Sequence, residues 1–147
     1  MSEYDLAVIG GGAGGLVVTS VAARLGLRVA LIERGTALGG DCLHTGCVPS
    51  KTLIHTARVA HRMRHASAVG LPAVEPEVDL GAVNRRIAEV VARIQAHDSA
   101  ERFRGYGAEV IFGAPRFTGR RELDIDGRSI RARRFVIATG SRPLVPA

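Results

Sequence analysis

The hydrophobic pattern of the N-terminal part predicts a strand, a helix and a second strand. Residues 4–9 form an apolar run that leads directly into six small residues, five of them Gly. Small and apolar residues then recur at helical spacings over residues 16–25, and Gly26 ends that helix. Residues 28–32 are a second apolar strand, and Glu33 closes it. Such an alternation is typical of a parallel sheet covered by helices.

Two long helices are predicted in the middle of the chain, after a loop over residues 36–41. Apolar side chains recur at helical spacing from Pro49 to about His65, and Pro49 suits a first helical turn. Residues 66–78 contain Gly and Pro and are predicted as a loop. A second amphipathic helix begins at Leu80 and is expected to fray near residues 104–105.

After Gly107 the pattern changes to short strands. Residues 108–112 form one, and a small antiparallel meander is predicted at residues 116–117, 122–125 and 128–132. Asp126-Gly127 is a strong two-residue hairpin signal within it. A last apolar strand, residues 134–138, leads into the turn Thr-Gly-Ser-Arg-Pro at residues 139–143, where small residues offer a cofactor contact or form an ordinary turn.

The turn after the first strand carries G-x-G-x-x-G at Gly10, Gly12 and Gly15. Between a strand and a helix, with an acid ending the next strand, this spacing is typical of dinucleotide binding. The helix N-terminus would supply N–H groups to the phosphates. Glu33 is expected to bind a ribose hydroxyl and to repel the 2′-phosphate that Arg34 would otherwise attract. A glycine-rich turn without a ligand is the alternative.

Composition narrows the class of protein. With 147 residues the chain has the size of one domain, and 4% aromatic residues without Trp argue against a stacking platform for nucleic acid. The net charge is +6, but the basic residues are dispersed, so no nucleic-acid partner is predicted. No run of eighteen apolar residues and no secretory signal are visible. The prediction is a cytoplasmic protein without membrane contact.

The two cysteines, Cys42 and Cys47, lie in a glycine-bounded loop that runs into a helix. In a cytoplasmic protein this favours redox or metal chemistry over a structural disulfide. Cys47 would lie near the helix start, where the dipole stabilises a thiolate. Lys51, the only Lys in the chain, would add positive charge one turn further along. A low-pKa thiolate beside a second cysteine suits thiol–disulfide exchange.

Zinc and an unreactive cysteine pair are the alternatives for this loop. Four side chains of this region are of types that bind zinc: Cys42, His44, Cys47 and His55. Their spacing matches no familiar zinc pattern and leaves the glycine pairs and Pro49 without a role. No metal site is therefore predicted.

The motif G-G-D-C-L-H-T-G-C-V-P-S-K at residues 39–51, after the glycine fingerprint, closely resembles the class I pyridine nucleotide–disulfide oxidoreductases. That family includes dihydrolipoamide dehydrogenase, mercuric reductase and glutathione reductase. The resemblance implies an α/β, Rossmann-like FAD-binding domain over residues 1–147, with a parallel sheet, flanking helices and a small antiparallel β-meander. It also implies nicotinamide and interface domains in a longer, homodimeric enzyme, so this chain alone is expected to be incomplete for turnover.

The resemblance assigns roles to individual residues. Cys47 would be the thiolate that contacts the flavin, Cys42 the interchange thiol, and Lys51 a neighbour of the reactive ring edge. Hydride would pass from NAD(P)H to FAD, and electrons then to the Cys42–Cys47 disulfide and to a small disulfide or mercuric-ion substrate. The implied cofactor-binding residues are Gly10, Gly12, Gly15, Glu33, Arg34, Gly40, Asp41, Cys42, Cys47, Lys51, Ala114, Pro115, Thr139 and Gly140.

The chain departs from the family pattern at two of these positions. Asp41 replaces the usual Thr, which brings an acid near a phosphate-bearing ligand. Pro115 has no N–H for the adenine, so that contact is weakened or made by Ala114. Two other functions stay open: a catalytically inactive dinucleotide-binding or interaction module, and a regulatory domain that binds a nicotinamide nucleotide.

Overall fold

The computed structural model describes residues 2–141 and 144–146. The chain divides into two compact units, which we call the sheet unit (residues 1–41 and 95–147) and the helical unit (residues 42–94). The Arg142-Pro143 end of the predicted turn lies outside the described residues. None of the helices in the described part is long and apolar enough to cross a membrane.

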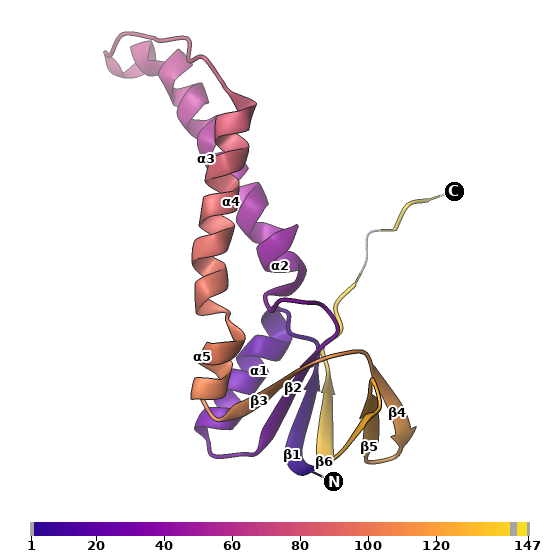
Figure 1. The fold of residues 1–147 in the computed structure, drawn as a ribbon. Coiled ribbons are helices and arrows are strands. Elements are labelled where there is room, and N and C mark those ends of the chain that lie inside the picture. Colours follow the sequence, from indigo (N-terminus) through magenta and orange to yellow (C-terminus); the bar gives the residue numbers. More distant parts are fainter. Residues whose placement is uncertain (1, 142–143, 147) are drawn as a thin grey trace. The chain divides into compact units, whose positions relative to one another are not determined.

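The sheet unit contains one six-stranded sheet in the order β3-β2-β1-β6-β5-β4 (Figure 1). Four strands run parallel: β1 (Ser2–Ile9), β2 (Val29–Glu33), β3 (Ala108–Phe112) and β6 (Arg128–Ile137). The meander strands β4 (Pro115–Gly119) and β5 (Glu122–Ile125) continue the sheet in antiparallel fashion beyond β6. The helices α1 (Ala13–Arg24) and α5 (Ala100–Gly105) also belong to this unit. The predicted Rossmann-like architecture is confirmed.

Successive residues of the parallel strands enter two different hydrophobic clusters, as strand pleating requires. Val8 and Leu31 pack with α1 and α5 residues such as Leu16 and Phe103. Ile32, the neighbour of Leu31, joins the second cluster, whose other members come from the strands, including β5 of the meander. The central strand β2 is buried at its first four positions, which explains its continuous apolar sequence.

The structure corrects three predicted boundaries. The two strands expected over residues 128–138 are one strand, β6, and Arg133 within it forms an ion pair with Asp5 at 3.5 Å. The second long helix is two helices, α4 (Leu80–His97) and α5. Ser99 starts α5, because its hydroxyl accepts the Arg102 N–H at 3.3 Å.

The third correction concerns the loop after β2. Gly40–His44 form the short helix α2, where a loop was expected to reach residue 41.

The predicted hairpin turn at Asp126-Gly127 is confirmed. Both residues have positive φ, 50° and 88°, and Ile125 pairs with Arg128 across the turn.

The helical unit contains most of α2, then α3 (Cys47–Arg64), a short 3₁₀ helix η1 (Ala66–Val69) and most of α4. The segment after η1 returns to α3, where the Val74 N–H donates to the Met63 carbonyl at 3.0 Å. Glu75 also forms an ion pair with Arg64 at 2.7 Å. The buried hydrophobic side chains among residues 42–94 are Leu43, Ala60 and Val83.

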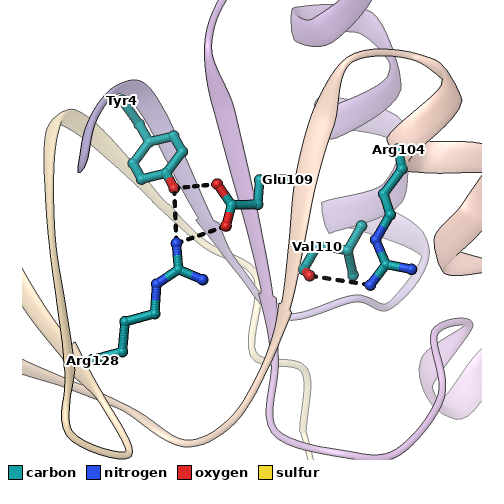
Figure 2. Close-up of polar contacts among 5 residues, drawn as sticks. All are labelled: Tyr4, Arg104, Glu109, Val110 and Arg128. Carbon is teal, nitrogen blue, oxygen red and sulfur yellow. Dashed lines mark hydrogen bonds and ion pairs between the residues drawn. The ribbon is translucent and has the colours of Figure 1, made fainter.

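A polar network links three strands of the sheet unit (Figure 2). The Tyr4 hydroxyl on β1 donates to the Glu109 carboxylate on β3, and Arg128 at the start of β6 donates to both. The Tyr4 hydrogen bond, together with the Arg128 charge, lowers the pKa of Glu109 below its ordinary value. The network thus ties the turn of the meander to the parallel part of the sheet.

Candidate functional site

Two fingerprint glycines are required by close packing at the end of β1. Gly10 has a φ of 110°, and a Cβ there would lie 2.2 Å from the carbonyl oxygen of Ala138. A Cβ on Gly15 would lie 1.8 Å from the carbonyl oxygen of Gly10. Any side chain at either position would push apart the turn, α1 and the end of β6. These contacts are the helix–strand packing that the fingerprint predicts.

The other fingerprint glycine, Gly12, is half-buried, but its Cβ position is not crowded. A Cβ there would meet a single atom within 4 Å, the Gly40 Cα at 3.7 Å. Gly12 is also the N-cap of α1, with no side-chain cap and no acid in the first turn. The turn therefore offers exposed backbone to an anionic ligand, as a pyrophosphate site requires.

The segment after β2 is hydrogen-bonded to the glycine turn that follows β1. Gly39 donates its N–H to the Gly11 carbonyl at 2.8 Å and forms a parallel bridge with Gly12. Gly40 has a φ of 58°, and a Cβ there would lie 2.7 Å from the Gly12 Cα. Asp41 follows, with a carboxylate oxygen 4.0 Å from the Cβ position of Gly140. The structure thus brings together four of the predicted residues: Gly12, Gly40, Asp41 and Gly140.

Glu33 is held by backbone N–H groups on both sides of its carboxylate. One oxygen accepts from Gly11 and the other from Gly35, each at 2.7 Å. Each oxygen keeps a further lone pair, so the carboxylate can still accept hydrogen bonds from ribose hydroxyls. The position at the carboxyl end of β2 is the one that a dinucleotide-binding acid occupies.

A cleft of about 340 Å³ opens beside Glu33, at the carboxyl ends of the parallel strands. Six of the predicted cofactor-binding residues line it: Gly10, Glu33, Arg34, Ala114, Pro115 and Thr139. The rest of the lining is apolar and comes from Ile9, Ile32, Phe117 and Ile137. An apolar pocket with a carboxylate at one side suits an adenosine group.

Sequence reasoning missed several residues that shape this region. Gly11 stands between two fingerprint glycines, and a Cβ there would lie 2.5 Å from a methyl group of Leu38. Phe117 and Ile137 enter the cleft from β4 and β6. Ile137 ends β6, which was a signal for the carboxyl edge of the sheet, whereas Phe117 lies in the middle of β4 and its place at the cleft follows only from the strand order.

The helical unit carries the predicted catalytic residues. Cys47 is exposed at the start of α3, and Cys42 on α2 is half-buried. A hydrogen bond to Cys47 raises the pKa of the Cys42 thiol, loss of solvation acts the same way, and the charge of Lys51 opposes both. The two sulfurs are therefore neighbours. Lys51 follows one turn later on α3 and is exposed.

The zinc alternative has no support in the geometry. Within residues 2–141 and 144–146, no group of three or more His, Cys, Asp or Glu side chains is placed to hold a metal ion. His44 and His55 are both exposed.

Residues 4–147 match the pyridine nucleotide-disulphide oxidoreductase family. The chain belongs to this family. It is 39% identical to a dihydrolipoyl dehydrogenase of Thermus scotoductus over 98% of its own length, and 34% identical to a mercuric reductase of Bacillus cereus over 98%. The family resemblance proposed from the cysteine motif is thus confirmed.

A solved structure supports the same assignment. The chain superposes with a TM-score of 0.80 and 27% identity on a copper(II) complex of a cysteine-to-serine mutant of RclA, an HOCl-induced flavoprotein disulfide reductase of Escherichia coli. The match covers 99% of this chain and 30% of RclA. The chain likewise spans 31% of the Thermus relative and 23% of the Bacillus relative. It therefore corresponds to one portion of these longer proteins.

Proposed function

We propose that this chain is the FAD-binding portion of an oxidoreductase that uses NAD(P)H to reduce a small disulfide or mercuric ion, with Cys42 and Cys47 as its redox-active pair. The observation that carries the proposal is the pair of neighbouring thiols, Cys42 on α2 and Cys47 at the start of α3, in a chain that matches the family over residues 4–147. A cytoplasmic location and a homodimeric complete enzyme are part of the same proposal.

The residues present fit an FAD molecule. Gly12 and the N-terminus of α1 offer open backbone to the pyrophosphate, and Glu33 offers its carboxylate to the adenosine ribose. Glu33 would also repel a 2′-phosphate, which favours an unphosphorylated ribose despite the adjacent Arg34. Gly40, Asp41, Thr139 and Gly140 would follow the dinucleotide along the carboxyl ends of the strands. Bound FAD would supply the two-electron link between the nicotinamide and the cysteines.

The cysteines would act by thiol–disulfide exchange. Two electrons and two protons convert the Cys42–Cys47 disulfide into two thiols. The Cys42 thiolate would attack a substrate disulfide, form a mixed disulfide and release one substrate thiol. The Cys47 thiolate would then attack the Cys42 sulfur, which restores the internal disulfide and releases the second thiol. Lys51 would stabilise the thiolates through its charge.

Titration with FAD and with NAD tests the proposal. The purified chain should bind FAD more tightly than NAD, with the absorbance of bound flavin and about one FAD per chain at saturation. Reduced protein should then show two free thiols, which oxidised protein lacks. A chain that takes up no FAD would indicate an interaction module, and tighter binding of NAD would indicate a nicotinamide-binding regulatory domain.

A further inference from the structure

The two tyrosines of the chain, Tyr4 and Tyr106, use their hydroxyl groups in opposite ways. The Tyr4 hydroxyl donates to the Glu109 carboxylate, which requires its proton, although Arg128 also donates to it. The Tyr106 hydroxyl accepts from Nε of Arg102 at 2.6 Å, and among the described residues no acceptor is placed for its proton. The surroundings of Tyr4 therefore favour the neutral phenol, whereas those of Tyr106 favour the phenolate.

A second guanidinium lies against Tyr106. The Cζ atom of Arg24, at the end of α1, lies 4.2 Å from the centre of the Tyr106 ring, within the range of a cation–π contact. The Arg102 guanidinium is held from its other side, because its Nη1 donates to the His97 carbonyl at 3.2 Å and lies 2.9 Å from Nδ1 of His97. Tyr106 thus lies between two cations, one of which is positioned by three contacts.

A hollow of about 280 Å³ opens beside these groups, lined by residues of α1, of α5 and of the segment before α5. Its lining includes both guanidiniums, the Tyr106 ring and Asp98, the one acid among its nine residues. Tyr106 is half-buried, which leaves it accessible to a small reagent, whereas Tyr4 is only 6% exposed. The hollow shares no lining residue with the dinucleotide cleft.

The contacts of Tyr106 lower its pKa below the ordinary value. The Arg102 hydrogen bond contributes most, loss of solvation opposes it, and Arg24 acts in the same direction as Arg102. A lower pKa increases the fraction of phenolate at neutral pH, and the phenolate is the nucleophilic form. The intrinsic reactivity of such an anion falls with its pKa, but by less than its fraction rises, as it does for thiols.

We propose that Tyr106 is a modification site that takes an acyl group on its phenolic oxygen from an activated carboxylic acid, such as an acyl phosphate or an acyl imidazole. The oxygen attacks the carbonyl carbon of the donor and forms a C–O bond. The bond from that carbon to the leaving group breaks, the leaving group takes the electron pair, and the phenolic proton passes to water. Nothing is oxidised or reduced. The charges of Arg24 and Arg102 favour the negative charge that develops on the carbonyl oxygen.

Acetylation of the chain with N-acetylimidazole at neutral pH tests the proposal, with mass spectrometry of tryptic peptides as the readout. Tyr106 should be acetylated about ten-fold or more faster than Tyr4, and hydroxylamine should remove the group, as it does from a phenyl ester. Arg102→Leu should lower the rate at Tyr106 about three-fold, because the donor to the phenolic oxygen is gone. The pH profile of the reaction should also move to higher pH in this variant.

Arg104→Leu is the matched control, because Arg104 lies on the same helix but directs its guanidinium to the Val110 carbonyl (Figure 2). It should leave the rate and the pH profile of Tyr106 unchanged. A second measurement uses Tyr4→Phe, in which Tyr106 is the only phenol of a chain without Trp. Its ultraviolet absorbance should show the phenolate at a lower pH than N-acetyltyrosine amide does, and adding Arg102→Leu should reverse this shift.

Three results would overturn the proposal. Equal acetylation rates for the two tyrosines would do so. An unchanged rate and pH profile in Arg102→Leu would leave exposure alone as the cause of the reactivity. An equal loss in Arg104→Leu would assign the effect to the general positive charge of the surface. FAD binding is measured separately, so none of these results would affect the proposed function.

Discussion

The sheet unit and the helical unit hold themselves together by different means. The sheet unit buries two hydrophobic clusters, one against α1 and α5 and the other among the strands. In the helical unit the buried hydrophobic side chains are only three, Leu43, Ala60 and Val83, although among the described residues each unit exposes nine large hydrophobic side chains. The dinucleotide elements thus lie on a tightly packed scaffold, whereas the thiols lie on helices with little core of their own.

The residues proposed to bind the dinucleotide and the cysteines proposed to carry out the redox chemistry therefore lie in units that differ in packing. Residues around the cleft are placed by contacts that admit no extra atom, as at Gly10 and Gly15. Such rigidity suits the recognition of a fixed ligand. The cysteines need partial exposure, because a substrate must reach their sulfurs.

The largest expected effect comes from removing the sulfur of Cys47 in the helical unit. In the FAD-loaded and reduced chain, Cys47→Ser should abolish the absorption band that arises from a thiolate beside the flavin, because the proposed donor sulfur is gone. Cys42→Ser should keep the band, since the sulfur of Cys47 remains. A visible spectrum after anaerobic reduction distinguishes them, and a band that survives in Cys47→Ser would refute the assignment.

A matched pair of leucine truncations compares the cores of the two units. Leu31 on β2 is fully buried, so Leu31→Ala should lower the free energy of unfolding by about 2–5 kcal/mol. Leu53 on α3 is 47% exposed, and Leu53→Ala should change it by about 0.5 kcal/mol or less. Urea denaturation followed by circular dichroism measures both. Similar losses for the two variants would show that the helical unit depends on its own packing as much as the sheet unit does.

Removal of the Glu33 carboxylate tests the binding side of the comparison. Glu33→Ala should weaken the binding of FAD by about 1–3 kcal/mol, because a charged acceptor for the ribose and for two backbone N–H groups is lost. Glu33→Gln keeps one oxygen acceptor, so its affinity for FAD should fall between those of the unmodified chain and of Glu33→Ala. Fluorescence titration of FAD gives the affinities, and an unchanged value in Glu33→Ala would show that this carboxylate does not hold the ribose.

The smallest expected effect concerns the Tyr4–Glu109–Arg128 network. Because Glu109 has a lowered pKa in the folded protein, its charge stabilises the fold above the ordinary value of 4.5, and this contribution is lost as the pH falls through the lowered pKa. Glu109→Gln should therefore cost about 1 kcal/mol or less at neutral pH, and the difference should shrink under acid.

Urea denaturation at neutral and acidic pH measures this difference. Tyr4→Phe is the control, because it removes the hydrogen bond that contributes most to the lowered pKa. It should leave a weaker pH dependence than the unmodified chain has. If the loss of unfolding free energy in Glu109→Gln grew toward low pH, the charge of Glu109 would not be what stabilises the fold, and this role of the network would be contradicted.

Local patterns were enough to predict most strands, both long helices and the fingerprint, because each depends on residues close in sequence. The helix break at Ser99 was missed because the apolar periodicity continues across it, although Ser is a favoured N-cap. The division of β6 was wrong because Arg133 and Arg134 interrupt the apolar alternation, while backbone pairing with β1 continues through that stretch.

The candidate site was predictable where a motif names its residues, and not where distant segments meet. Six predicted residues share the cleft, because the fingerprint and the strand-end acid have fixed places in this fold. The contact between Asp126 and Ala114 joins a hairpin turn to a separate connection, and a turn signal does not say which backbone N–H its side chain will accept. Phe117 could not be assigned to the cleft before the place of β4 in the sheet was known.

The place of β6 has a consequence for how the molecule is made. It follows the other five strands in the chain, yet it lies between β1 and β5 and pairs with both. While the ribosome is still adding β6, the N-terminal strand has one edge without its final neighbour, and that edge must wait for residues more than a hundred positions downstream. Such late closure is slow, and it exposes an unpaired edge to other nascent chains. Expression at low temperature or with chaperones should therefore raise the yield of folded protein.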